Sequence, residues 1–306
     1  MSRLSLGLDT SNYTTSAALT DSSGNIVAEK RVLLKVKPGE KGLRQSDALY
    51  QHWQNLPVIL EEMLRDYGRD IACVSASTRP RPQEGSYMPV FNAGKAAGQM
   101  LAAQADIPFW EFSHQEGHVT AAAYGNDVDF SEPVICAHLS GGTLELVLVK
   151  DGIYTIIGGT KDISYGQLLD RAGVDIGYPF PAGKYIDELA CGFVREDEKT
   201  PFSRVFCDKT YLNLSGTETQ LKSAKNNFEK DAIAYFLMER ISESFVKICN
   251  YAKEETGAQQ VLVAGGVACS SFLRMFCEKE NYMFGQPFLC SDNAAGISLM
   301  GGRKCL

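Results

Sequence analysis

Apolar runs separated by short polar turns occur at two places along the chain. The turn is Asp9-Thr10-Ser11 in the first place and Ser140-Gly141-Gly142 in the second. The apolar runs cover residues 4–8, 16–19 and 26–28 in the first place, and residues 134–139, 144–149 and 153–157 in the second. Runs of this length, bounded by turn residues, are typical of β-strands. Because the same pattern occurs twice, the sequence predicts a duplicated α/β lobe.

Two longer segments, residues 46–67 and 227–253, carry apolar residues at helical spacing. The stripe is Leu49, Trp53, Leu56, Leu60, Met63 and Leu64 in the first segment, and Ile233, Leu237, Ile241, Phe245 and Ile248 in the second. Pro57 lacks a backbone N–H, so we expect it to kink or restart the first helix. Residues 260–263 predict a buried strand that ends at Gly265-Gly266 and leads into another helix. Strands that alternate with helices predict an α/β protein.

The chain has 306 residues, of which 44% are hydrophobic and 22% are charged. This composition supports one large or two medium domains and excludes the disordered and fibrous classes. No low-complexity linker marks a boundary, and we place the division near residue 112, giving lobes of residues 1–112 and 113–306. No apolar stretch approaches the ~20 residues that span a bilayer, and the first residues lack a signal-peptide layout. We therefore expect a cytoplasmic protein with no membrane partner.

The charge balance constrains any nucleic-acid partner. Thirty Lys and Arg against thirty-seven Asp and Glu give a formal net charge of −7, which repels phosphate. An RNA would need a local basic patch, and residues 30–44 are one candidate, with Arg79 and Arg81 as possible additions. The basic residues of that segment are Lys30, Arg31, Lys35, Lys37, Lys41 and Arg44. A solvated basic loop is the more common reason for such a cluster.

The cysteines indicate a reducing environment. There are nine of them, an odd number, and none forms a Cys-x-x-Cys pair. This argues against a disulfide framework and against a cysteine-type zinc site. We predict buried, reduced thiols.

The sharpest local signal is His114-Gln115-Glu116-Gly117-His118. Residues four apart on a helix share one face, with Cβ atoms about 5–6 Å apart, so both imidazoles could bind one divalent ion. The alternative is two ordinary polar residues at a helix start. A metallopeptidase is disfavoured, because in HExxH the Glu follows the first His, whereas Glu116 lies about 200° around the helix from His114. Glu116 is better interpreted as a solvated carboxylate or as one that supports the ligands.

A third ligand should come from elsewhere in the chain. Asp292, in Cys290-Ser291-Asp292-Asn293, precedes a small-residue helix and by default is only a helix cap. If Asp292 also reaches the histidine pair, two His and one carboxylate would leave coordination positions open, as a catalytic metal needs.

Glycine-rich turns add a possible anion site. Ser140-Gly141-Gly142 and Gly265-Gly266 let backbone amides approach a phosphate closely, although each turn alone is weak evidence. Together with Asp9-Thr10-Ser11 they make three loops of the kind that encircle a nucleotide between two lobes.

In order along the chain, these motifs resemble the TsaD family, the tRNA N6-adenosine threonylcarbamoyltransferases once called O-sialoglycoprotein endopeptidases. The matching segments are Gly7-Leu8-Asp9-Thr10-Ser11, His114 to His118, Leu139-Ser140-Gly141-Gly142, Gly166 to Arg171 with Asp170, Tyr178-Pro179 through Gly183 and Asp187, Ala264-Gly265-Gly266-Val267, and Ser291-Asp292-Asn293-Ala294. The resemblance covers nearly the whole chain. It implies the duplicated two-lobe actin/Hsp70/sugar-kinase (ASKHA) fold with a nucleotide cleft between the lobes.

The resemblance also implies a chemistry and its residues. His114, His118 and Asp292 would bind a divalent metal, Fe²⁺ or Zn²⁺, and Asp9 and Ser11 would be catalytic. The substrate would be an ATP-derived threonylcarbamoyl-adenylate, bound by Ser140, Gly141, Gly142, Asp170, Gly183, Asp187, Gly265, Gly266 and Ser270. Its carbamoyl group would pass to N6 of the adenosine beside the tRNA anticodon. A TsaB-like protein and an ATPase are the partners that the resemblance implies.

Several positions depart from the family pattern. Tyr13-Thr14 replace an acidic pair, Thr143 replaces a His, and Ser270 replaces an Asn. Residues 78–82, Thr-Arg-Pro-Arg-Pro, replace a glycine-containing loop, and residues 214–219 lack the family's Lys. These departures suggest a divergent paralogue and leave two alternatives open. One is a carbamoyl or phosphoryl transferase with another acceptor, and the other is a non-catalytic nucleotide-binding protein.

Overall fold

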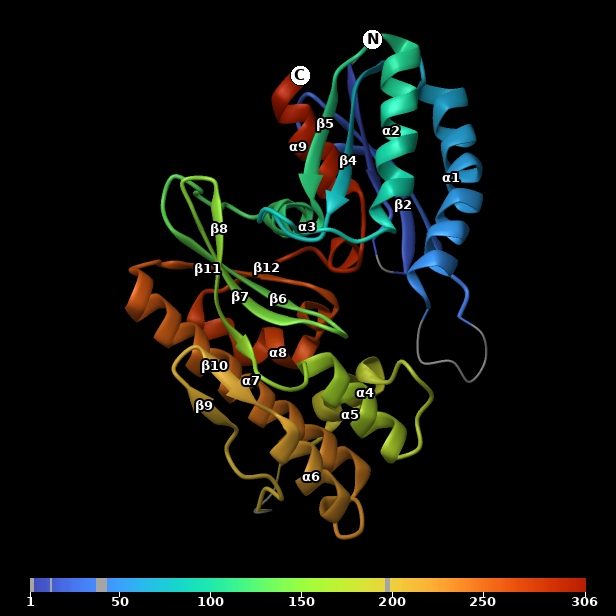
Figure 1. Ribbon diagram of the computed structural model, residues 1–306. Helices are drawn as coiled ribbons and strands as arrows, with labels where there is room; N and C mark the ends of the chain where they lie inside the picture. The colour runs from blue at the N-terminus through green and yellow to red at the C-terminus, as the bar shows by residue number, and fades with distance from the viewer. Residues whose placement is uncertain (1–2, 12, 37–42, 196–198) are drawn as a thin grey trace. The chain divides into compact units, whose positions relative to one another are not determined.

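The computed structural model describes all residues except 1–2, 12, 37–42 and 196–198 (Figure 1). The chain forms two compact units, Met1–Tyr124 with Ser291–Leu306, and Gly125–Cys290. The division differs from the predicted boundary at residue 112, because the helix that carries the two histidines packs with the C-terminal helix in the first unit. The candidate metal ligands therefore lie in the first unit and not in a C-terminal lobe.

A five-stranded sheet, in the order β3-β2-β1-β4-β5, forms the centre of the first unit. Its strands are β1 (Leu4–Asp9), β2 (Thr14–Asp21), β3 (Ile26–Leu33), β4 (Ile71–Arg79) and β5 (Phe109–Ser113). β2 pairs antiparallel with β1 and β3, whereas β4 runs parallel to β1 and β5. All six residues of β1 are buried, as expected for a central strand covered on both faces.

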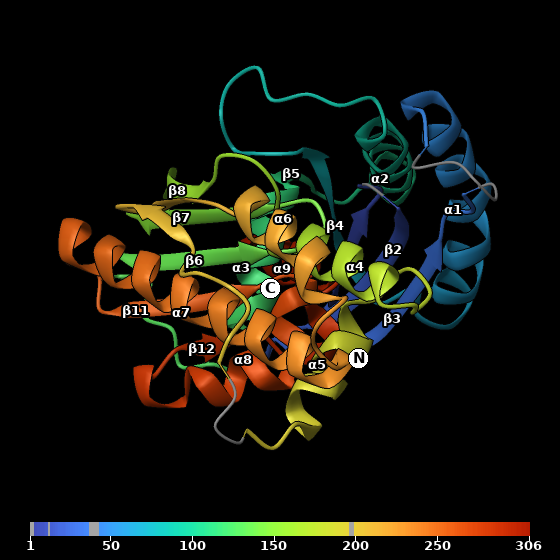
Figure 2. The ribbon, with the colours of Figure 1, turned by 90° about the horizontal axis from the view of Figure 1, so that it is seen from below.

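The first unit also contains the helices α1 (Gln45–Tyr67), α2 (Phe91–Ala105), α3 (His114–Ala123) and α9 (Ala295–Cys305). α1 and α2 pack against each other, as Figure 2 shows, and α9 packs against β1, β2 and β4. α1 continues through Pro57, so the expected restart of the helix is wrong. Leu56, Leu60 and Met63 form a buried stripe that spans the proline, and this packing outweighs one missing hydrogen bond.

One disulfide joins Cys73 of β4 to Cys305 at the end of α9. The prediction of reduced thiols throughout is therefore wrong for this pair. The pairing could not be seen in the sequence because 232 residues separate the two cysteines. The free cysteines of the described chain include buried and exposed examples.

The second unit contains a seven-stranded sheet in the order β12-β11-β6-β7-β8-β10-β9. Its strands are β6 (Val134–Leu139), β7 (Leu144–Lys150), β8 (Ile153–Thr160), β9 (Phe206–Asp208), β10 (Tyr211–Asn213), β11 (Gln260–Ala264) and β12 (Met283–Phe284). β6, β7 and β8 form an antiparallel meander, and β11 and β12 continue parallel to β6. The order and directions of β8-β7-β6-β11-β12 repeat those of β3-β2-β1-β4-β5. The predicted duplication is confirmed.

Helices surround this second sheet. They are α4 (Tyr165–Asp175), α5 (Gly183–Gly192), α6 (Ser215–Ala224), α7 (Lys230–Thr256) and α8 (Ser271–Phe276), with short 3-10 helices η1 (Gly266–Cys269), η2 (Glu278–Glu280) and η3 (Pro287–Leu289). The predicted apolar stripe of α7 is buried, and α7 packs against α5 and against β6, β7 and β8. In the part of the chain that the structure describes, no helix has the length and apolar character needed to cross a membrane.

Candidate metal centre

The helix α3 begins with a capping box that fixes the position of both histidines. The Ser113 hydroxyl accepts a hydrogen bond from the Glu116 N–H at 3.2 Å, and the Glu116 carboxylate accepts one from the Ser113 N–H at 2.7 Å. Glu116 is therefore occupied at the start of the helix, as expected for a carboxylate that does not bind the metal. The cap places His114 as the first residue of α3 and His118 one turn later.

The structure brings the three predicted ligands together within the first unit. The His114 and His118 Nε2 atoms are 2.9 Å apart, and the Asp292 Oδ1 lies 3.5 Å from the first and 3.3 Å from the second. Both imidazoles are buried, and the carboxylate is mostly buried. One nitrogen or oxygen donor from each residue thus points to a common centre.

Two glycines allow the close helix crossing that brings Asp292 to the histidines. A Cβ atom on Gly296 of α9 would lie 2.0 Å from the Gly117 carbonyl oxygen of α3. A Cβ on Gly117 would in turn lie 2.8 Å from Ile297 Cδ1. At position 296 only glycine fits, because a Cβ there would meet backbone atoms of α3, whereas at position 117 it would meet the Ile297 side chain. The loop before α9 therefore carries Asp292 next to the middle of α3.

Asp9 is a second buried carboxylate at this centre. Its Oδ2 lies 2.8 Å from His114 Nδ1, and its Oδ1 accepts hydrogen bonds from the Ser77 hydroxyl at 2.7 Å and the Ser11 N–H at 2.8 Å. A carboxylate on the far nitrogen of a ligating histidine fixes the ring and its tautomer. Asp9 contacts the ring nitrogen of His114 that does not face His118 and Asp292.

The pKa shifts describe a site that attracts positive charge. Burial opposes protonation of His114, but the charge of Asp9 and the hydrogen bonds to Asp292 and Asp9 outweigh it and raise the pKa of His114 to about 10. Burial and the neighbouring His114 charge lower the pKa of His118. Burial would raise the pKa of Asp292, yet its hydrogen bonds to His114 and His118 lower it strongly. Two carboxylates therefore stabilise a cation among two imidazoles.

The donor set fits a divalent metal. A zinc or iron ion with bonds of about 2.0–2.2 Å brings its ligand atoms to roughly 2.8–3.6 Å from one another, for angles between 90° and 110° at the metal. The separations between the donors, 2.9, 3.3 and 3.5 Å, lie close to that range. Two imidazoles and one carboxylate are also typical ligands of catalytic Zn²⁺ and non-haem Fe²⁺.

Ser11, two residues after Asp9 in the chain, has a buried hydroxyl. Its N–H donates to Asp9, but its Oγ has no hydrogen-bond partner among the described residues. Buried hydroxyls are nearly always paired, and the Ser11 hydroxyl can therefore still form a hydrogen bond.

The predicted substrate residues of the second unit lie at its glycine-rich turns. Ser140 and Thr143 close a tight turn through two hydrogen bonds, and Gly141 and Gly142 are exposed at its tip. Gly265 has a φ of 90°, and a Cβ there would lie 2.3 Å from the Leu139 carbonyl oxygen. Gly266, next to it, is exposed. The structure thus brings these two turns together at the ends of β6 and β11.

Three other predicted substrate residues have structural contacts. The Asp170 Oδ1 accepts hydrogen bonds from the Ala182 and Gly183 N–H groups at 2.7 and 3.1 Å, which ties α4 to the start of α5. The Asp187 carboxylate accepts from the Ser270 hydroxyl at 2.5 Å and from two N–H groups at the start of α8. Asp187 and Ser270 therefore join α5 to α8, and sequence reasoning missed this role.

The predicted basic patch is partly neutralised. Lys30 pairs with Glu62, and Arg31 pairs with Glu29 and donates to the Ser291 hydroxyl at 2.7 Å. Lys35 and Arg44 are exposed, whereas Lys37, Glu40 and Lys41 lie outside the described residues. Arg79 lies 3.9 Å from Glu116, close to the start of α3.

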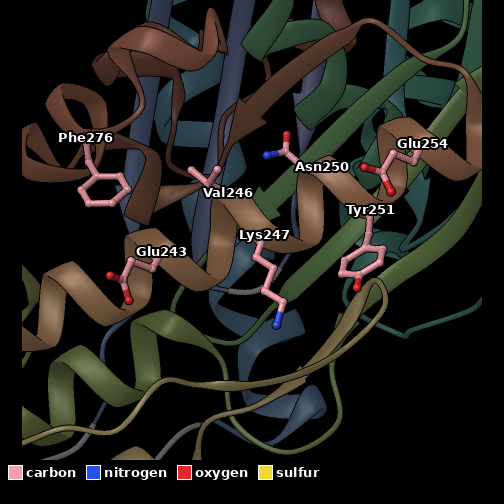
Figure 3. Close-up of a pocket in the computed structure, with 7 residues that line it drawn as sticks. All are labelled: Glu243, Val246, Lys247, Asn250, Tyr251, Glu254 and Phe276. Atoms are coloured by element: carbon pink, nitrogen blue, oxygen red, sulfur yellow. The ribbon is translucent and has the colours of Figure 1, made fainter.

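A surface cavity of about 510 Å³ lies elsewhere, on α7 (Figure 3). Its lining residues are Glu243, Val246, Lys247, Asn250, Tyr251 and Glu254 of α7 and Phe276 of α8. None of them is a predicted site residue.

The model of the TsaD family, described as tRNA N6-adenosine threonylcarbamoyltransferase, matches residues 28–299. A Bacillus cereus protein of that name is 29% identical over 319 residues, covering 97% of this chain and 90% of its own length. A Methanothermobacter thermautotrophicus protein, named as a probable bifunctional tRNA threonylcarbamoyladenosine biosynthesis protein, is 27% identical, covering 97% of this chain and 55% of its own length.

Solved structures share the fold. Thermococcus kodakarensis HypF superposes with a TM-score of 0.62 at 12% identity, over 98% of this chain and 47% of HypF. Component A of the Acidaminococcus fermentans (R)-2-hydroxyglutaryl-CoA dehydratase superposes with a TM-score of 0.59 at 17% identity, over 99% of both chains. The predicted actin/Hsp70/sugar-kinase fold class is confirmed.

Proposed function

Because this chain belongs to the TsaD family of transferases in tRNA threonylcarbamoyladenosine biosynthesis, we propose that it modifies the adenosine beside the tRNA anticodon. The group transferred is the threonylcarbamoyl group of threonylcarbamoyl-adenylate. In the reaction, N6 forms a bond to the carbamoyl carbon, the bond from that carbon to the phosphate oxygen breaks, AMP leaves, and N6 loses one proton. The observation that carries the proposal is the convergence of His114, His118 and Asp292 in a buried site.

We assign these three residues as ligands of Fe²⁺ or Zn²⁺, with Asp9 as the residue that orients His114. The chemistry that such an ion supplies when bound is polarisation of the carbamoyl-phosphate end of the substrate. Asp9 keeps His114 Nε2 directed at the other donors through its 2.8 Å contact with Nδ1. Ser11 would supply its unpaired hydroxyl to the reacting end of the adenylate.

The second unit would bind the rest of the adenylate. Gly141, Gly142 and Gly266 are exposed at turns whose backbone amides can approach a phosphate. Asp170 accepts the hydrogen bonds from Ala182 and Gly183 through Oδ1, which leaves Oδ2 for a ribose hydroxyl and places Gly183 beside it. Asp187 and Ser270 would act indirectly, by fixing the loop that follows Gly265 and Gly266.

The partners follow from family membership. tRNA would be the acceptor, and a TsaB-like protein and an ATPase would take part in the cycle. Lys35 and Arg44 are exposed cations that could contact phosphate, whereas Lys30 and Arg31 are already paired with carboxylates.

The test uses purified protein with synthetic threonylcarbamoyl-adenylate, labelled in its threonine, and unmodified tRNA. We expect label in tRNA when a TsaB-like protein and an ATPase are present, and loss of labelling with His118→Ala. The control is Asp127→Asn, an exposed carboxylate of the second unit, which should label tRNA normally. Absence of label with the unsubstituted protein would contradict the proposal. Metal analysis of the same preparation then separates an inactive protein that retains iron or zinc from one that binds neither.

A further inference from the structure

A second surface cavity, of about 250 Å³, lies in the second unit between α7 and the residues that lead into β9. Three basic side chains line it, Arg240 and Lys247 from α7 and Arg204 from the segment before β9. Glu243 is the acidic residue of its described lining. None of these residues belongs to the proposed metal or adenylate site, so the cavity is a separate feature of this unit.

The charge of Arg240 is balanced by its neighbours. This residue is 9% exposed, and its terminal nitrogens contact the carboxylates of Glu243 and, at 3.4 Å, Glu239. Glu239 also pairs with Arg195 at 2.6 Å. The two arginines and the two glutamates therefore form a neutral network. The Nε–H of Arg240 has no acceptor among the described residues, and because buried donors are nearly always paired, it can still form a hydrogen bond.

The other two basic residues contribute a surplus of positive charge. Arg204 and Lys247 are exposed, and in the part of the chain that the structure describes neither lies within ion-pair distance of an Asp or Glu. Burial raises the pKa of the Cys207 thiol, another lining group, and the nearby charge of Lys247 opposes this rise. The Lys247 ammonium therefore lies close to the cavity. Two positive charges remain beside a network that is otherwise neutral.

We propose that this cavity binds a phosphate-type dianion, either free phosphate or a small phosphate monoester. A surplus of two positive charges matches a dianion, and guanidinium and ammonium groups are common protein ligands of phosphate. The volume lies below the ~300–1,000 Å³ of ordinary ligand pockets, which favours a small anion. The whole chain has a formal net charge of −7 and repels phosphate, so binding depends on this local surplus.

The arrangement assigns different roles to the three cations. Arg204 and Lys247 hold the anion from two elements, since one precedes β9 and the other lies on α7. Arg240 pairs with Glu243, which reduces the repulsion between that carboxylate and the anion. The bound anion therefore links the segment before β9 to α7. This site goes beyond the proposed transferase activity, whose substrate and metal residues do not line the cavity.

The first experiment measures the acylation of Lys247 and Lys222 by N-hydroxysuccinimidyl acetate in one sample of the full chain. Lys222 is an exposed cation on α6 that does not line the cavity, so it is the internal control. Mass spectrometry of the peptides follows both rates with and without inorganic phosphate. We expect phosphate to slow the acylation of Lys247 by about threefold or more, because the anion holds the ammonium, and to leave Lys222 unchanged. Equal effects on both lysines, or no effect, would overturn the proposal.

The second experiment determines the dissociation constant of inorganic phosphate by isothermal titration calorimetry. Arg204→Gln and Lys247→Gln should each weaken binding by about tenfold, because each removes one charge-assisted contact. Lys222→Gln should bind as the unsubstituted protein does, and circular dichroism checks that every variant is folded. Equal affinities for all three variants, or no binding by the unsubstituted protein, would refute the site.

Titration of glycerol 3-phosphate separates the two sources of the phosphate group. Binding tighter than that of inorganic phosphate would identify a monoester as the ligand, and weaker binding would identify free phosphate. Acetate, a monoanion, should bind more weakly than either, and acetate binding as tight as phosphate binding would contradict the charge match. These measurements use no tRNA, adenylate or metal, so their outcome is independent of the proposed function.

Discussion

Asp9 is the residue whose contacts decide how rigid the candidate centre is. It is 1% exposed and joins Ser77, the Ser11 N–H and His114 through its two oxygens. We predict that Asp9→Asn weakens Zn²⁺ binding by about 10–100-fold, because carboxylates that orient ligating histidines have effects of this size. Competition with a chromophoric chelator measures the dissociation constant. Asp21→Asn, at an exposed turn of the same unit, should bind as tightly as the unsubstituted protein, and equal affinities for both variants would refute the role of Asp9.

Among individual residues, the sequence predicted the three metal ligands better than it predicted the contact of Asp9 with one of them. His114 and His118 share a helix face, so their convergence follows from spacing alone. Asp292 was a candidate from its place before a small-residue helix, and the resemblance to the family supported it. The contact between Asp9 and His114 joins residues 105 positions apart and depends on the registers of β1 with β4 and of β4 with β5. No local pattern specifies that register. The contact with His114 could therefore not be expected from the sequence, and the catalytic role of Asp9 stays a prediction.

The crossing of α3 and α9 is the element-scale feature that brings Asp292 to the histidines. We predict that Gly296→Ala separates the two helices, because its Cβ would lie 2.0 Å from the Gly117 carbonyl oxygen. The variant should unfold at a lower temperature and bind Zn²⁺ more weakly, as calorimetry and chelator competition would show. Gly216→Ala is the matched control, since a Cβ at this helical position meets nothing within 4 Å and should leave stability equal or slightly higher. Equal melting temperatures for both variants would show that the crossing has room for a methyl group.

The start of α6 gives a pH-dependent prediction. The Asp162 carboxylate accepts hydrogen bonds from the Ile163, Leu214 and Ser215 N–H groups at 2.7, 2.9 and 3.0 Å. Burial opposes the charged form, but these bonds outweigh it and lower the pKa of Asp162 below its ordinary value. The stabilisation is therefore fully present above the unfolded pKa, about 4, and is lost as the pH falls toward the folded pKa.

Asp162→Asn should accordingly lower the melting temperature at pH 7 by a few degrees, for a loss of about 1 kcal/mol. The difference from the unsubstituted protein should shrink as the pH is lowered from 5 to 2, measured by circular dichroism. Asp127→Asn, at an exposed position, should show little difference at any pH. A destabilisation by Asp162→Asn that stays constant with pH would contradict the ionic origin of the effect.

Elements were predicted well where short-range patterns determine them. The strands of both meanders and the helices at 45–67 and 230–256 lie where apolar periodicity placed them, within a few residues. The interruption at Pro57 was wrong, because a local rule about proline cannot weigh the buried stripe that holds α1 against β2 and β3. The short strands β9 and β10 were missed, since three residues are too few to show alternation.

At the scale of the whole molecule, the chain leaves the first unit after residue 124 and returns to it at residue 291. The sequence could not show this return, because the apolar pattern of α9 does not specify which sheet it covers. In the structure the Ser298 hydroxyl donates to the Ser5 carbonyl oxygen at 2.7 Å, and Ser75 donates to the Ile297 carbonyl oxygen at 2.9 Å. These buried contacts make α9 part of the first unit's core. The predicted lobes of 1–112 and 113–306 would cut through that core.

This return gives a prediction about which parts of the chain fold alone. We predict that residues 1–124 joined to residues 291–306 by a flexible Gly/Ser linker fold cooperatively and bind Zn²⁺, within about tenfold of the full chain's affinity. Residues 1–124 alone should not fold, because β1, β2 and β4 would lose the helix that covers them, as well as the ligand Asp292. Urea unfolding followed by circular dichroism tests folding, and chelator competition tests binding.

A variant of the joined protein separates folding from metal binding. Asp292→Asn in that protein should leave the unfolding transition in place but weaken Zn²⁺ binding, because the substitution keeps α9 and removes one charged donor. If residues 1–124 alone fold and bind Zn²⁺ as tightly as the joined protein, then α9 is dispensable and Asp292 is not a ligand. If the joined protein fails to fold while the full chain is stable, the first unit depends on residues 125–290 for its stability. Either result would contradict the view that the C-terminal segment completes both the core and the metal centre of one unit.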